Sequence, residues 1–167
     1  MKMQTMTVTR LLRHLCLLLI AGLLSTGCKK DKDNAEPPAN TRVPMKFTLK
    51  VTGADANDVL NFQIAGGNND ASQYGTVVWK VNGTAQGNES VLSFKTQDFI
   101  GGTKTIVVES VKGFDFGSLN IYCANGDANT LTVSYKAEVD GNVETNGENI
   151  AIVNGTTHIK NFTYRKR

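Results

Sequence analysis

The chain has 167 residues, with 18 basic and 15 acidic side chains, and this length suits one domain with a hydrophobic core. Three basic residues and no acidic ones lie in the first 27 positions, so residues 28–167 are formally neutral. A neutral chain in which Lys and Arg form no stripe with aromatic residues lacks the charge distribution of a nucleic-acid-binding protein.

The first 27 residues have the three-part order of a secretory signal peptide. A basic segment with Lys2, Arg10 and Arg13 precedes a largely apolar run at 15–24, and small residues follow it. The run is shorter than the roughly 20 apolar residues of a transmembrane helix. We therefore expect residues 1–27 to be removed after export.

The junction itself, Leu24-Ser25-Thr26-Gly27-Cys28, resembles the lipobox of bacterial lipoproteins. The resemblance implies that Cys28 becomes the first residue of the mature protein and carries a diacylglycerol on its sulfur and a third acyl chain, such as palmitate, on its amine. Two acyl chains already give stable anchoring. The expected partner is thus the membrane, through the N-terminal lipid, and the expected location is the outer membrane.

Residues 28–44 are rich in charge and proline, which predicts a flexible tether that leads to a folded domain over 45–167. The tether begins with Lys29-Lys30-Asp31-Lys32-Asp33, which resembles the signal that exports some Gram-negative lipoproteins to the cell surface. A generic hydrophilic spacer is the alternative. Periplasmic and surface display therefore both stay open.

From Met45 onward, apolar residues recur at every second position, which is typical of strands with one buried face. The clearest runs lie at 45–51, 77–81 and 131–139, and further strands are predicted near 58–64, 90–96, 103–111, 117–124, 148–153 and 157–165. Five dipeptides that favour hairpin turns separate them: Asn82-Gly83, Asn125-Gly126, Asp140-Gly141, Asn146-Gly147 and Asn154-Gly155. The pattern predicts an all-β fold, a single antiparallel β-sandwich of Ig-like type with about seven to nine strands. A small β-barrel is the alternative.

Four segments of this domain also resemble MmpS-like accessory proteins. The opening strand at 46–53 and the later segments 117–121, 129–133 and 139–143 fall in the order found in that family. The resemblance implies a small membrane-tethered β-sandwich associated with transporters. This chain lacks the paired cysteines of that family and has a lipobox in place of a membrane helix.

The residues needed for catalysis are scarce. After the signal, the chain keeps one histidine, His158, and apart from Cys28 one cysteine, Cys123, and it has no Gly-x-Ser-x-Gly motif. Zinc sites need several such ligands. We expect Cys123 to pack in the core, His158 to lie at a surface position of a strand, and the protein to be no enzyme, without catalytic residues or a cofactor.

Two features could serve binding. Tyr122 is out of phase with Leu119, Ile121 and Cys123 and should face away from the core, where an aromatic ring can stack on a sugar. Trp79, in contrast, is in phase with Val77 and Val81 and should be buried. Weak calcium candidates are Asp55, Asn57 and Asp58, because calcium takes oxygen ligands, although Asp and Asn are also common turn residues.

The sequence therefore predicts a non-enzymatic membrane-anchored lipoprotein with a binding or structural, accessory role and a protein or glycan partner. A carbohydrate-binding accessory module is one alternative. A small hydrolase is another, against which the single histidine and the missing nucleophile motif argue.

Overall fold

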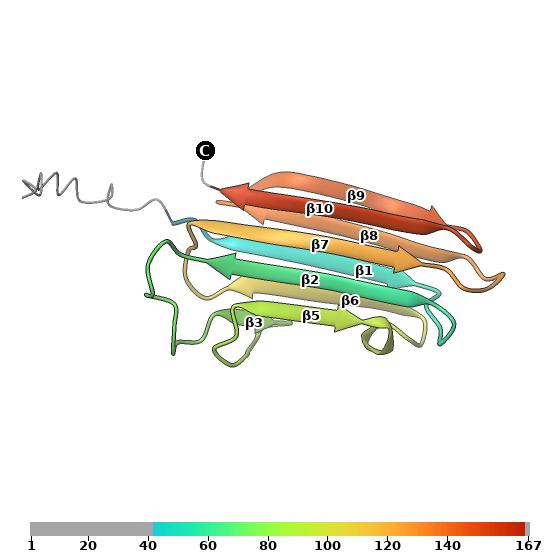
Figure 1. Ribbon diagram of the computed structural model, residues 1–167, viewed down its shortest axis with the longest axis horizontal. Coiled ribbons are helices and arrows are strands. Elements are labelled where there is room, and N and C mark those ends of the chain that lie inside the picture. Colours follow the sequence, from blue (N-terminus) through green and yellow to red (C-terminus); the bar gives the residue numbers. More distant parts are fainter. Residues whose placement is uncertain (1–41, 166–167) are drawn as a thin grey trace, which may run out of the picture. The chain divides into compact units, whose positions relative to one another are not determined.

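The computed structural model describes residues 42–165. The lipobox, Cys28 and the predicted tether up to residue 41 lie outside the described residues. Ten strands follow one another along residues 42–165, and one turn of 3-10 helix, η1 (Thr96–Asp98), lies between β5 and β6. Figure 1 shows their arrangement. The strands are β1 (Met45–Thr52), β2 (Val59–Gly67), β3 (Trp79–Val81), β4 (Thr84–Ala85), β5 (Val91–Lys95), β6 (Thr103–Ser110), β7 (Phe116–Ala124), β8 (Leu131–Val139), β9 (Asn142–Ile152) and β10 (Thr157–Arg165).

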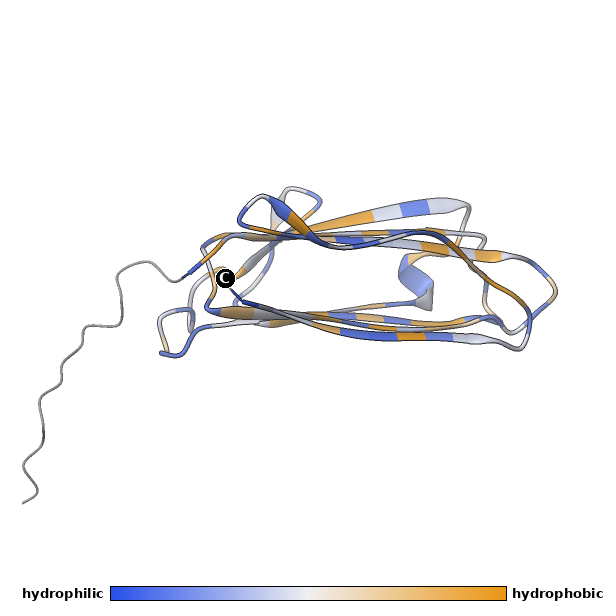
Figure 2. Ribbon diagram, turned by 90° about the horizontal axis from the view of Figure 1, so that it is seen from above, coloured by the Kyte–Doolittle hydropathy of each residue, from blue (hydrophilic) through white to orange (hydrophobic). Residues whose placement is uncertain are grey.

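The strands form two antiparallel sheets. One has six strands in the order β4-β3-β6-β1-β8-β9, and the other has four in the order β10-β7-β2-β5. Figure 2 shows the two layers edge-on, and they do not close into one cylinder. The predicted β-sandwich is confirmed, and the alternative of a small barrel is wrong. No helix among residues 42–165 is long and apolar enough to span a membrane.

The core lies between the sheets, and it follows directly from the alternation in the sequence. Phe47, Leu49 and Val51 of β1 are fully buried, while the residues between them face outward. β8 repeats the pattern over its whole length from Leu131 to Val139. Because successive side chains of a strand point to opposite faces, one period-two run supplies both a core face and a solvent face.

Trp79 is fully buried, as its phase predicts. Its ring lies 4.9 Å from that of Phe114 and 6.1 Å from that of Phe47, and its indole N–H donates to the Ser90 carbonyl at 3.2 Å. Gly66 makes room for it, because a Cβ there would lie 2.8 Å from the Trp79 ring. The tryptophan therefore connects three strands, β1, β2 and β3, and two loops at one end of the core.

Two predicted strands differ from the observed ones. The run at 77–81 forms a strand only from Trp79, and Val77 is 41% exposed rather than buried, because 77 and 78 still belong to the preceding loop. The strand predicted at 148–153 is the second half of β9, which begins at Asn142. Most of this edge strand is exposed on both faces, so its first half shows no apolar alternation.

The predicted turns behave in three ways. Asn82-Gly83 and Asp140-Gly141 adopt positive φ and close the β3–β4 and β8–β9 hairpins. Asn146-Gly147 is not a turn but lies inside β9, where a Cβ on Gly147 would meet the Tyr135 ring at 2.5 Å. Asn125-Gly126 and Asn154-Gly155 lie in connections that cross from one sheet to the other.

The sandwich has two distinct ends (Figure 1). At one end Val43 exchanges two 3.0 Å backbone hydrogen bonds with Phe114, beside the β2–β3 and β6–β7 loops. The other end carries the β1–β2 and β7–β8 loops. The described chain therefore enters at the end opposite to the Asp- and Asn-rich loops.

Candidate functional site

Tyr122 points outward from the four-stranded sheet and is 40% exposed. It lies on β7 with Asn61 of β2 on one side and Ile159 of β10 on the other. The outward direction agrees with the phase of the sequence. A binding role for Tyr122 stays a prediction.

A row of amide side chains lies next to Tyr122 on the same face. The strand register places Gln63 of β2, Asn120 of β7 and Asn161 of β10 side by side. Neither these three nor Asn61 makes a side-chain hydrogen bond within the described part of the chain. Each amide carries both donors and an acceptor. This surface, named the amide face below, therefore has unused hydrogen-bonding groups of both kinds.

The amide face is also uncharged at its centre. The charged outward residues of the four-stranded sheet, Lys95 and Arg165, end β5 and β10. The six-stranded sheet instead carries ion pairs outside, Lys46 with Glu109 at 3.1 Å and Lys136 with Glu138 at 3.2 Å. The two outer faces of the sandwich thus differ in chemistry, and the amide face suits a neutral polar ligand.

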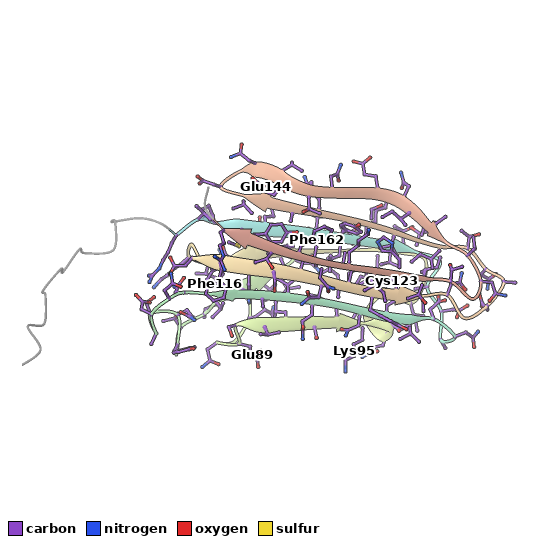
Figure 3. All side chains as sticks on the ribbon, turned by 45° about the horizontal axis from the view of Figure 1, so that its top comes forward. Glu89, Lys95, Phe116, Cys123, Glu144 and Phe162 are labelled. Atoms are coloured by element: carbon purple, nitrogen blue, oxygen red, sulfur yellow. The ribbon has the colours of Figure 1, made fainter. Side chains whose placement is uncertain are left out.

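A second aromatic ring lies on this face. Phe116 begins β7 and is 40% exposed, and its ring lies over Gly67, where a Cβ would come within 2.5 Å. Figure 3 shows Phe116 near one end of β7 and Cys123, the neighbour of Tyr122, toward the other. The amide row is therefore flanked along β7 by one aromatic ring on each side.

Four polar side chains gather at the loop end of the sandwich and are named the Asx cluster. Asp55 and Asn57 come from the β1–β2 loop, and Asp127 and Asn129 come from the β7–β8 loop. The Asn129 amide donates to Asp127 at 3.0 Å and to Asp55 at 3.5 Å. The Asn57 amide donates to Asp127 at 3.4 Å. The structure thus joins two of the three predicted calcium candidates to a pair from a distant loop.

The third predicted candidate, Asp58, has a different place. It is 6% exposed, and its two carboxylate oxygens accept the backbone N–H groups of Asp55 at 3.0 Å and Gly126 at 3.3 Å. A carboxylate held this way positions both loops. Gly126 packs against Asn57 so closely that a Cβ there would collide with the backbone.

The Asx cluster brings two carboxyl groups together. Asp55 is in hydrogen-bonding contact with Asp127, and this contact, with the backbone N–H of Asn129, lowers the pKa of Asp127 below its usual value. Neighbouring carboxylates repel unless a proton or a cation lies between them. Among residues 42–165, no three His, Cys, Asp or Glu side chains form a metal-binding group, so any cation here would also need the amide oxygens.

His158 and Cys123 lie in packed surroundings. His158 is on a strand, but it is half-buried rather than on the surface, with Nε2 3.3 Å from the Tyr135 hydroxyl, and this burial lowers its pKa. Cys123 is fully buried, as predicted, and burial raises the pKa of its thiol to about 12. A protonated, buried thiol is a poor nucleophile.

Sequence reasoning did not single out the amide row or the pairing of Asp55 with Asp127. The period-two pattern places Asn120 on the same face as Tyr122, and Asn61 on the same face as Gln63. The alternation within one strand does not determine which strands are neighbours, so the register that places β2 and β10 beside β7 could not be predicted. In the loops, only the high frequency of Asp and Asn indicated a possible site.

The domain is thus an open β-sandwich with a neutral amide face along one sheet and an Asx cluster at one end. No protein-family model and no curated protein matches the sequence. Among solved structures, the chain is similar to a DUF4425 family protein from Bacteroides ovatus, with a TM-score of 0.50 and 18% identity over 74% of this chain and 95% of that one.

A second similar structure is a protein from Parabacteroides distasonis, determined by NMR in its calcium-bound form. The TM-score is 0.59 at 9% identity, and the match covers 77% of this chain and 96% of that one. At these identities both likenesses show the fold alone.

Proposed function

We propose that the protein is a non-enzymatic lipoprotein of the outer membrane that binds a glycan on its amide face. The observation that carries this proposal is the row of Gln63, Asn120 and Asn161, which has unused donors and acceptors and lies beside the exposed ring of Tyr122. Sugars present hydroxyl groups that match such amides, and their C–H faces stack on aromatic rings.

The position of this face supports the proposal. The face runs along the sheet, and the lipid on Cys28 would reach the domain through the end that carries Val43. A ligand on the sheet face would therefore not compete with the anchor for the same loops. A structural or accessory role toward another protein is the alternative, and the same face would then be the contact surface.

Replacing Tyr122 by alanine tests the glycan proposal. We expect Tyr122→Ala to weaken binding at least tenfold, which corresponds to about 1.4 kcal/mol, because the variant loses the stacking surface. The ring is exposed, so the free energy of unfolding should change by no more than about 0.5 kcal/mol. A glycan array identifies the ligand. Calorimetric titration with that glycan then measures the affinity of the wild type and of Tyr122→Ala.

Tyr74→Ala is the matched control, because Tyr74 is 69% exposed and lies in the β2–β3 loop, away from the amide face. It should bind like the wild type. A second variant, Asn120→Ala, should also weaken binding. If wild-type protein binds no glycan on the array, or if the Tyr122 and Tyr74 variants bind equally well, the amide face is not a glycan site.

The Asx cluster favours a second candidate function, calcium binding. The side chains of Asp55, Asn57, Asp127 and Asn129 carry six oxygens between them, and calcium takes six to eight from carboxylates, amides, carbonyls and water. The four residues therefore fit a calcium ion in donor chemistry. The calcium-bound form of the Parabacteroides distasonis protein, which shares the fold, adds support.

We expect calcium to raise the midpoint of thermal unfolding of the wild type and Asp127→Asn to abolish this shift. A ligand at 100 times its Kd adds about 2.7 kcal/mol of stability. Asp140→Asn is the control, since Asp140 lies in the β8–β9 turn at the other end of the sandwich. An unchanged midpoint in millimolar calcium, or an equal shift in both variants, would exclude this site.

A further inference from the structure

Tyr122 and Phe116 lie on the same strand and point to the same face of it. They are six residues apart on β7, and the register of β7 with β2 and β10 continues from one to the other without a bulge. A strand rises about 3.3 Å per residue, so their Cα atoms lie about 20 Å apart. No single sugar ring is long enough to contact both side chains. The two aromatic rings are therefore either separate contacts or the two ends of one long site.

The ring of Phe116 lies low on the neighbouring strand. Its tip occupies the place that a Cβ of Gly67 would take, since such a Cβ would lie 2.5 Å from the ring. Phe116 nevertheless stays exposed. A ring that lies low on a sheet and keeps an exposed side offers an apolar platform to a ligand. The same ring also shields the Gly67 backbone, which is the structural alternative.

The surface between the two rings is lower and polar. Along this stretch β7 carries Asn120 and Ser118 on the outward face, and both side chains are shorter than an aromatic ring. The register places Gln63 on one side of Asn120 and Asn161 on the other. The amide row therefore crosses the line between the rings. It can offer hydrogen bonds to both edges of a ligand that runs along β7.

The amide row is nearer to one ring than to the other. Asn120 is two residues from Tyr122 and four from Phe116. These separations correspond to about 7 Å and about 13 Å along the strand. The charged outward residues of this sheet, Lys95 and Arg165, end β5 and β10, so the middle of the line is neutral. A short ligand can thus join Tyr122 to the amides, and only a longer one also reaches Phe116.

We infer that the amide face binds a linear, uncharged chain of β-1,4-linked sugars that runs along β7, with one end on Tyr122 and the other on Phe116. This inference rests on the proposed glycan function and adds the shape and the length of the ligand. Because bonds of about 1.5 Å set the size of a sugar ring, each unit of an extended chain adds about 5 Å. Five units therefore place the first on Tyr122 and the last on Phe116, with the amide row beside the second and the third.

The test is calorimetric titration of the full-length protein, purified in detergent, with cello-, xylo- and manno-oligosaccharides of three and of six units. Six units reach both rings, whereas three units that lie on Tyr122 and the amide row end short of Phe116. We expect at least one of the three series to bind the wild type. Its hexasaccharide should bind at least tenfold more tightly than its trisaccharide, because only the longer ligand makes the second stacking contact.

Phe116→Leu keeps an apolar side chain over Gly67 but has no aromatic ring. It should lower the affinity for the hexasaccharide to about that for the trisaccharide and leave the affinity for the trisaccharide unchanged. A purely structural Phe116 would not produce this dependence on ligand length, because the same folded protein binds both ligands. Tyr122→Ala should weaken the binding of both lengths. Tyr74→Ala, which lies away from this face, should change neither.

The outcomes separate the linear chain from the glycan function on which it rests. If the trisaccharide and the hexasaccharide bind equally well, or if Phe116→Leu keeps the gain, the linear chain is wrong while the glycan function stands. The same conclusion follows if the wild type binds only branched glycans on the array, or only acidic chains such as those of galacturonic acid. If no glycan binds at all, both proposals are wrong.

Discussion

Trp79→Ala is expected to lower the free energy of unfolding by about 3–5 kcal/mol, the usual cost of truncating a fully buried tryptophan. The ring is packed between Phe47 and Phe114 and lies against Gly66. Its removal would leave a cavity bordered by these three residues. Collapse is difficult here, because Gly66 has no side chain that could fill the space. Urea denaturation followed by circular dichroism measures the change.

The substitution also removes a tie between segments. The indole N–H donates to the carbonyl of Ser90, just before β5, so the tryptophan links β3 of one sheet to β5 of the other. Trp79→Phe is the control that keeps most of the packing but loses the hydrogen bond. Its free energy of unfolding should lie between those of the wild type and Trp79→Ala. A cost below about 1 kcal/mol for Trp79→Ala would contradict the packing described here.

The strands β1 and β8 have one buried face over their full length, and the sequence predicted both well: the boundaries of β8 agree with the prediction, and β1 ends one residue later than its apolar run. The boundaries of the edge strand β10 also agree, although only Tyr164 of this strand is buried. The two-residue β4 and the first half of β9 were missed, because edge strands bury little on either face and so lack alternation. The ten observed strands exceed the expected seven to nine for this reason.

The candidate sites were predictable only in part. Phase alone gave the outward direction of Tyr122 and the burial of Trp79. The amide row and the contact between Asp55 and Asp127 depend on which strands and loops become neighbours, and this is a property of the topology.

Cys28→Ala is expected to release the protein from membranes almost completely. Each buried methylene of an acyl chain adds about 0.8 kcal/mol of membrane affinity, so the loss of two or three chains removes tens of kcal/mol. Residues 28–167 carry no net charge that could replace the anchor by attraction to anionic lipids. Fractionation of cells and labelling with radioactive palmitate measure attachment and acylation separately.

Cys123→Ala is the matched control, because it removes the only other cysteine that remains after the signal. The Cys123 thiol is fully buried and protonated, so it cannot accept an acyl chain in the folded domain. The control should therefore keep both the label and the membrane fraction. If Cys28→Ala stays with washed membranes but loses the label, a partner holds the protein there. If Cys28→Ala keeps the palmitate label, Cys28 is not the acylated residue and the lipobox assignment is wrong.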